Sequence, residues 1–147
     1  MKEKLLAYVI LAVENRMQTS WAAMQAAQAS ANEEGKSSAG DKYETARAMG
    51  QLAREMQGKQ YAQAKQERMV LERINLKDRF SKVNLGALVQ VSSGWFFLAV
   101  SVGSVEIDGQ VVLVISPQSP IGQLLMGKSV KETFSFRGNT ESIIGVY

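Results

Sequence analysis

The sequence predicts an α+β protein in which an N-terminal antiparallel helical hairpin, a coiled coil, precedes a small antiparallel β-sheet with one short helix. Three observations support this class. No proline occurs before Pro117, and apolar residues recur every three or four positions through the first half. From Gly86 onward, β-branched and aromatic residues alternate with polar ones. The expected domains are a hairpin at 1–75, a linker at 76–84 and a β domain at 85–147.

Two long helices are expected on either side of the glycine-flanked stretch Gly35–Gly40. Helices of about 34 residues would each be about 50 Å long at 1.5 Å per residue. A two-helix hairpin has little core beyond its seam, so the residues at its tip are those it presents to a partner. The expected seam runs through Leu6, Ile10, Val13, Met17, Trp21, Met24, Gln28 and Ala31, and returns through Ala46, Met49, Ala53, Met56, Gln60, Ala64, Glu67, Leu71 and Ile74.

The second half contains signals for short strands and tight turns. Asp108-Gly109 between two β-rich runs predicts a type I′ hairpin. Ser119 followed by Pro120, with Gly127 closing the segment, predicts a short capped helix. The strands are expected at 87–91, 95–100, 105–107, 110–115, 133–137 and 142–147.

The composition excludes several kinds of chemistry. The chain of 147 residues has no cysteine and no histidine. Disulfides, thiolate nucleophiles, the usual zinc sites and imidazole acid–base catalysis are therefore ruled out. A net charge of +3 does not favour tight independent binding to DNA or RNA. The start of the chain has no convincing cleavage site for a signal peptide, so a cytoplasmic protein is expected.

The stretch from Ile115 to Lys128 resembles a known family. Ser119-Pro120-Ile121-Gly122, followed by Leu125 and Gly127-Lys128, is similar to the SP-I/L-G-x-x-L-x-G-K signature of the Gre transcript-cleavage factors of bacterial RNA polymerase. In that family the signature follows a strand and opens the short helix of an FKBP-like domain, which a helical hairpin precedes. The resemblance covers the whole chain in architecture and residues 86–137 in motif. It implies that Trp95, Ser119, Pro120 and Lys128 are candidates for docking onto the polymerase.

The expected hairpin tip also resembles the family. Gly40-Asp41-Lys42-Tyr43-Glu44-Thr45-Ala46 keeps the spacing of the family's G-D-L-x-E-N-A-E-Y, and departs from it at Lys42, Thr45 and Arg47. The resemblance implies that Asp41 and Glu44 are the catalytic acids and ligands of a Mg²⁺ that the polymerase mainly holds. The hairpin would enter the polymerase secondary channel and promote cleavage of backtracked RNA, with no turnover of its own. The residues expected to contact RNA or the polymerase at the tip are Ser37, Ser38, Lys42, Tyr43 and Arg47.

Other interpretations of the same residues remain open. Asp41 and Glu44, three residues apart at a helix start, also fit a capping box, in which both side chains bond backbone amides and no metal is needed. The departures at the tip also fit a Gre-like regulator of the secondary channel that lacks cleavage activity. A third hypothesis is a non-catalytic coiled-coil scaffold whose hairpin packs against a partner helix.

Overall fold

The computed structural model describes residues 1–37 and 41–147, and the side chains within these ranges apart from residues 31, 33–37 and 41–43. The chain forms two compact units. The hairpin unit comprises Leu11–Arg68, and the sheet unit comprises Met1–Ile10 together with Met69–Tyr147. Within the described ranges, no helix has both the length and the apolar character needed to cross a membrane.

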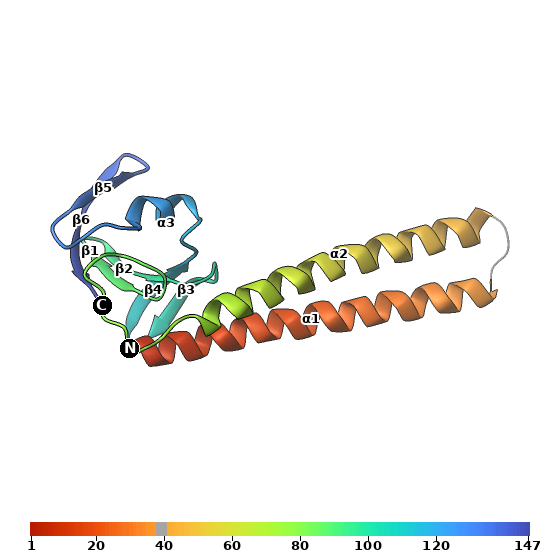
Figure 1. Cartoon of the computed structure of the whole chain (residues 1–147). Coiled ribbons are helices and arrows are strands. Elements are labelled where there is room, and N and C mark those ends of the chain that lie inside the picture. Colours follow the sequence, from red (N-terminus) through yellow and green to blue (C-terminus); the bar gives the residue numbers. More distant parts are fainter. Residues whose placement is uncertain (38–40) are drawn as a thin grey trace. The chain divides into compact units, whose positions relative to one another are not determined.

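Helices α1 (Lys2–Ser37) and α2 (Asp41–Glu72) lie side by side and run in opposite directions, which confirms the predicted hairpin (Figure 1). They contain 36 and 32 residues. Both are free of proline and rich in alanine, glutamine, glutamate and lysine, residues with high helix propensity. At the end of α2 the amides of Arg73 and Ile74 donate to carbonyls three residues earlier, and these bonds close the last turn.

Small side chains form the seam of the hairpin unit. Among its described residues, Val13, Ser20 and Ala64 are buried. Gly58 faces Met24, whose Sδ would lie 3.6 Å from a Cβ added to that glycine. Small residues at a helix contact let the two backbones approach closely, at the expense of apolar burial. The hairpin unit therefore has a narrow core.

The predicted seam was wrong for Trp21, Met49 and Met56, whose side chains are 47%, 62% and 54% exposed. Steps of three and four residues fit several neighbouring stripes of one helix, so the pattern does not select between Ser20 and Trp21. Close approach of the helices favours the smaller residue. The Trp21 ring instead lies beside Tyr61 on the flank of the hairpin, with ring centroids 5.4 Å apart.

The sheet unit contains six strands in the order β3-β4-β2-β1-β6-β5, and the short helix α3 (Pro120–Leu125) separates β4 from β5 in the chain (Figure 1). This confirms the α+β class. The strands are β1 (Leu88–Val91), β2 (Gly94–Leu98), β3 (Gly103–Ile107), β4 (Gln110–Ile115), β5 (Thr133–Phe136) and β6 (Asn139–Val146).

The sheet is mixed, whereas the sequence pattern predicted an antiparallel one. Strands β2 and β4 pair in parallel, with Trp95 opposite Val112, while the other neighbours are antiparallel. The predicted turn at Asp108-Gly109 is present, with φ angles of 51° and 78°. It returns β4 alongside β3, which occupies the sheet edge. Strand β4 thus lies between β3 and β2 and runs in the same direction as β2.

Apolar side chains cover both faces of this sheet. On one face, Ile121 and Leu125 of α3 join a buried cluster with Val89, Leu98 and Ile143. Side chains on adjacent strand positions point to opposite faces. The second face therefore carries Phe97, Val105, Val112 and Val114, which are also buried. The buried apolar side chains that the helical parts of this unit contribute outside the first cluster are Leu5, Leu6, Val9 and Leu71.

Candidate functional site

The acidic pair predicted at the hairpin tip lies at the start of α2. Asp41 is the first residue of that helix, and Glu44 follows within its first turn with an exposed side chain. Arg47, one further position along the same i, i+3 spacing, is also exposed and has an interaction partner. Residues three apart lie on one face of a helix. The backbone therefore brings all three positions onto one face at the beginning of α2.

The other predicted tip residues lie around this helix start. Ser37 is the last residue of α1, and Lys42 and Tyr43 belong to the first turn of α2. Ser38 lies outside the described residues, as do the side chains of Ser37, Asp41, Lys42 and Tyr43. Their contacts, including the capping box between Asp41 and Glu44, stay predictions.

Two carboxylates are a small donor set for a divalent cation. Mg²⁺ takes about six oxygen ligands in octahedral geometry and keeps several waters. Among the residues that the structure describes, no group of three or more acidic side chains is placed to hold a metal ion. The positive end of the α2 dipole disfavours a cation at this position as well. A role in metal binding for Asp41 and Glu44 stays a prediction, and it requires another molecule to contribute most of the ligands.

In the sheet unit, Ser119 organises the turn between β4 and α3. It is the N-cap of α3, and its Oγ accepts a hydrogen bond of 3.1 Å from the amide of Gly122. The same hydroxyl donates to the carbonyl of Ser116 at 2.6 Å. The Oγ of Ser116 in turn accepts from the amide of Gln118 at 3.1 Å. These bonds confirm the predicted cap and fix the path of the chain into the helix.

Gly122 is where this turn leaves no room for a side chain. A Cβ at this position would overlap the carbonyl oxygen of Ser116, and would come within 2.9 Å of Ser119 Oγ and 3.0 Å of Pro117 Cα. Backbone atoms cannot move aside as a flexible side chain can. The glycine of the Ser119-Pro120-Ile121-Gly122 motif therefore has a steric role in the sheet unit.

The candidate docking residues are spread over the sheet unit. Pro120 is exposed at the start of α3, and Lys128 is partly exposed just after that helix. The carbonyl of Lys128 accepts from the amide of Val83 at 2.8 Å, which ties this segment to the stretch before β1. Trp95 on β2 is also partly exposed, and its ring lies 6.1 Å from that of Tyr147.

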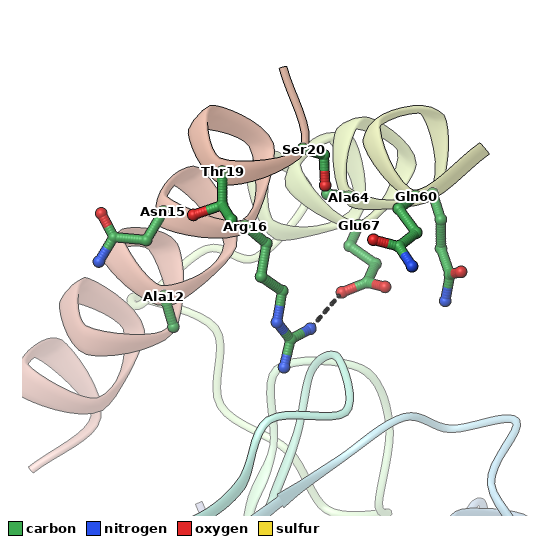
Figure 2. Close-up of a pocket in the computed structure, with 9 residues that line it drawn as sticks. Ala12, Asn15, Arg16, Thr19, Ser20, Gln60, Ala64 and Glu67 are labelled. Carbon is green, nitrogen blue, oxygen red and sulfur yellow. Dashed lines mark hydrogen bonds and ion pairs between the residues drawn. The ribbon is translucent and has the colours of Figure 1, made fainter. Parts of the chain in front are cut away.

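A polar hollow on the hairpin unit was missed by the sequence interpretation. It has a volume of about 400 Å³ and lies between α1 and α2 (Figure 2). Across it Arg16 Nη1 donates to Glu67 Oε2 at 3.1 Å. A second pair between the two helices, which does not line the hollow, joins Arg68 Nε to Glu14 Oε1 at 3.2 Å. The sequence signal that could have indicated this hollow was Glu67, an acidic residue at a position expected in the seam. The lining residues are Ala12, Asn15, Arg16, Thr19, Ser20, Gln60, Gln63, Ala64 and Glu67.

Two lysines in the first turn of α1 bind distant parts of the sheet unit. Lys4 Nζ lies 2.7 Å from Asp108 Oδ1, and this hydrogen bond holds the pKa of Asp108 below its usual value. Lys2 Nζ donates to the carbonyl oxygen of Tyr147 at 3.2 Å and lies 5.0 Å from the centre of the Phe80 ring. Burial lowers the pKa of Lys2, partly offset by the charge of Asp78. No local pattern in the sequence reports these contacts.

The fold defines the class: an α+β protein in which a long helical hairpin precedes a six-stranded mixed sheet. No known family model matches the chain, and no curated protein matches its sequence. Among solved structures, the chain is similar to one described as the transcription factor Gfh1. The match has 14% sequence identity and a TM-score of 0.38, and covers 94% of this chain and 92% of the Gfh1 chain.

Proposed function

We propose that this protein is an accessory factor of RNA polymerase whose hairpin enters the secondary channel and promotes cleavage of backtracked RNA. The observation that carries the proposal is the position of Asp41, the first residue of α2 after α1 has ended at Ser37. An acidic pair at the turning end of a long hairpin suits delivery into a narrow channel. The Gre-like motif at Ser119–Lys128, with its capped helix, supports the same assignment.

In this proposal the protein contributes part of a metal site and no complete active centre. Asp41 and Glu44 would be the protein's ligands to a Mg²⁺ held mainly by the polymerase. That ion would polarise the scissile phosphate and lower the pKa of the attacking water. Glu44 is exposed, as a side chain that reaches into another protein's site must be. Lys42 and Arg47 would attract the phosphates of the displaced RNA, and Tyr43 would stack on a base.

The sheet unit would supply the anchor on the polymerase surface. Pro120 begins α3 and Lys128 follows that helix; both are at least partly exposed, as is Trp95 on β2. Leu124 within α3 and Val130 a few residues after it are 37% and 44% exposed and add apolar area for such a contact. Ser119 would act indirectly by holding α3 in place.

The test is a cleavage assay on stalled, backtracked elongation complexes. Added protein with Mg²⁺ should release short RNA fragments from the 3′ end. Asp41→Asn or Glu44→Gln should lower the rate at least about tenfold, because loss of a group that only orients a metal ligand already costs about 10- to 100-fold. Glu55→Gln is the matched control, because Glu55 is an exposed acid further along α2. Equal cleavage by the wild type and both tip variants would refute the role of the pair.

The same assay separates the other hypotheses. Lys42, Thr45 and Arg47, which depart from the family pattern, favour a regulator that occupies the channel without cleavage. Inhibition of transcript elongation with no fragments released would support the regulator. A protein that neither binds the polymerase nor affects elongation would support the scaffold.

A further inference from the structure

A second hollow lies in the sheet unit, where the segment between α2 and β1 meets the start of α1 and the end of β6. Its volume is about 610 Å³. Proteins commonly bind small molecules in hollows of about 300–1,000 Å³. The residues that line it all belong to the sheet unit, and they include neither the predicted tip residues nor Ser119–Lys128. The proposed function therefore assigns no role to this hollow.

Positive charge predominates in this basic hollow. Three of the side chains that line it are cations and one is an acid, namely Lys2, Lys77 and Arg79 against Asp78. Lys77 and Arg79 are exposed, and neither forms an ion pair with a residue that the structure describes. Glu3, the acid in the first turn of α1, does not line the hollow. The cations of the hollow are thus available to an anion from outside.

Lys2 is the cation held most firmly inside the hollow. Its ammonium lies between the carbonyl oxygen of Tyr147, at 3.2 Å, and the ring of Phe80, 5.0 Å from the ring centre. An ammonium has three N–H donors, and the bond to Tyr147 uses one of them. Burial lowers the pKa of Lys2, because its charge is incompletely solvated. A bound anion would supply the missing solvation.

The hollow also has an aromatic wall. Tyr147 lines it and is 53% exposed. The Tyr147 ring lies across Gly145, where an added Cβ would come within 2.8 Å of Cε2 and 2.9 Å of Cζ. The absence of a side chain at Gly145 therefore makes room for the ring, and Trp95 lies beside it, with ring centroids 6.1 Å apart. An exposed ring held in this way suits stacking on a planar group such as a nucleobase.

We propose that the basic hollow binds a nucleoside phosphate, with the phosphates among Lys2, Lys77 and Arg79 and the base stacked on Tyr147. Phosphate oxygens accept hydrogen bonds from several cations at once, and such charge-assisted bonds are strong. A long nucleic acid needs cations spread along a surface, whereas these converge on one hollow. The inference goes beyond the proposed function and does not depend on it, because every residue it uses belongs to the sheet unit.

Calorimetric titration of the full chain with ADP, without divalent cations, tests the proposal. ADP should bind at least about tenfold more tightly than adenosine, which lacks the phosphates. It should also bind at least about fivefold more tightly than pyrophosphate, which lacks the base. Affinity should fall as the salt concentration rises, because salt screens exposed charges. No binding of ADP up to millimolar concentration overturns the proposal, as does equal affinity for ADP and either fragment.

Two changes of charge identify the site with opposite signs. Lys77→Gln with Arg79→Gln should weaken ADP binding by about threefold to tenfold. Asp78→Asn removes the one acid of the hollow and should strengthen binding by up to about fivefold. Loss of folding cannot produce a gain in affinity, so Asp78→Asn keeps the test decisive if the double variant is unstable.

The matched control for the double variant is Arg54→Gln with Lys59→Gln, which removes the same charge from the hairpin unit. ADP should bind this variant as it binds the wild type. Equal weakening by both double variants would mean that ADP responds only to net charge, and would overturn the proposal. Weaker binding by Asp78→Asn would overturn it as well.

Substitution of Tyr147 tests the contact with the base. Tyr147→Leu should weaken ADP binding at least about fivefold and leave pyrophosphate binding unchanged, whereas Tyr147→Phe keeps a stacking ring and should bind ADP normally. Trp95 fluorescence in a Trp21→Phe background gives a second readout, because Trp95 lies beside Tyr147. Unchanged ADP affinity in Tyr147→Leu would overturn the assignment of a nucleoside phosphate.

Discussion

Lys4 Nζ lies 2.7 Å from Asp108 Oδ1, an ion pair between the first turn of α1 and the turn that joins β3 to β4. The two residues are 104 positions apart in the chain. Both side chains are exposed, so water screens much of their attraction. The pair therefore contributes mainly to the position of the start of α1 within the sheet unit.

The pair makes the stability of the sheet unit depend on pH in the acidic range. The pKa of Asp108 is lowered in the folded protein, chiefly by the hydrogen bond from Lys4. Its contribution is therefore complete above the unfolded value of 3.8 and is lost as the pH falls through the lower folded value. Asp108→Asn should flatten this part of the pH profile, and asparagine also tolerates the positive φ of this turn.

Thermal unfolding between pH 2 and 7, followed by Trp95 fluorescence in a Trp21→Phe background, checks this expectation. Each unit contains one of the two tryptophans, so the signal then comes from the sheet unit alone. Glu106→Gln, an exposed acid two residues away, is the control. Parallel pH profiles for the wild type and Asp108→Asn would contradict the assignment.

Exchanging the charges of Arg16 and Glu67 should restore what either reversal alone removes. Arg16→Glu places two acids across the hollow and should destabilise the hairpin unit, whereas Arg16→Glu with Glu67→Arg re-forms the pair. The expected coupling is about 0.2–1 kcal/mol, since Arg16 is 43% exposed. Urea unfolding followed by Trp21 fluorescence in a Trp95→Phe background measures the cycle. A coupling of zero would show that the pair has no energetic role.

Gly122→Ala should destabilise the sheet unit by about 1–3 kcal/mol, the usual cost of forcing extra atoms into a packed site. The added methyl would overlap the carbonyl of Ser116, whose position is fixed by the bonds of Ser119. Urea unfolding read through Trp95 measures the loss. Ser119→Ala should cost about 0.5–2 kcal/mol through the lost cap, and so separates steric overlap from loss of the hydrogen bond. An unchanged midpoint for Gly122→Ala would contradict the steric role.

Gly58→Ala should have the opposite effect to Gly122→Ala and stabilise the hairpin unit by about 0.5–1 kcal/mol. Glycine inside a helix costs backbone entropy, and alanine removes that cost. The new Cβ would lie at ordinary contact distance, 3.6 Å from Met24 Sδ. Helicity during thermal unfolding, measured by circular dichroism, should show a higher midpoint. A lower one would mean that the seam is too tight for a methyl group.

Local patterns predicted the secondary structure well where particular residue types mark a helix, a turn or a helix start. The run without proline predicted both long helices, Asp108-Gly109 predicted the turn between β3 and β4, and Ser119-Pro120 predicted the start of α3. The predicted seam was wrong where the same spacing fits more than one stripe of side chains along a helix. Ser20 and Trp21 lie three and four residues after Met17, so both fit the spacing of the seam, and only the close approach of α2 favours the smaller residue.

For the candidate site, the sequence indicated the acidic residues Asp41 and Glu44, and the backbone shows where they lie. The Asp41-x-x-Glu44 spacing indicated one helical face, and the structure places that face at the start of α2. The hollow at Arg16 and Glu67, and the contacts of Lys2 and Lys4, had no comparable signal. Their partners are 51 to 145 residues away in the chain.

The sequence by itself determined which segments are helices, strands and turns, because propensity, capping and turn chemistry act between residues a few positions apart. Tertiary structure alone decided the parallel pairing of β2 with β4, the burial of Ser20 in place of Trp21, and the pairing of Arg16 with Glu67. Each of these depends on which segments pack together, and packing is settled by the fit of side chains that are distant in the chain.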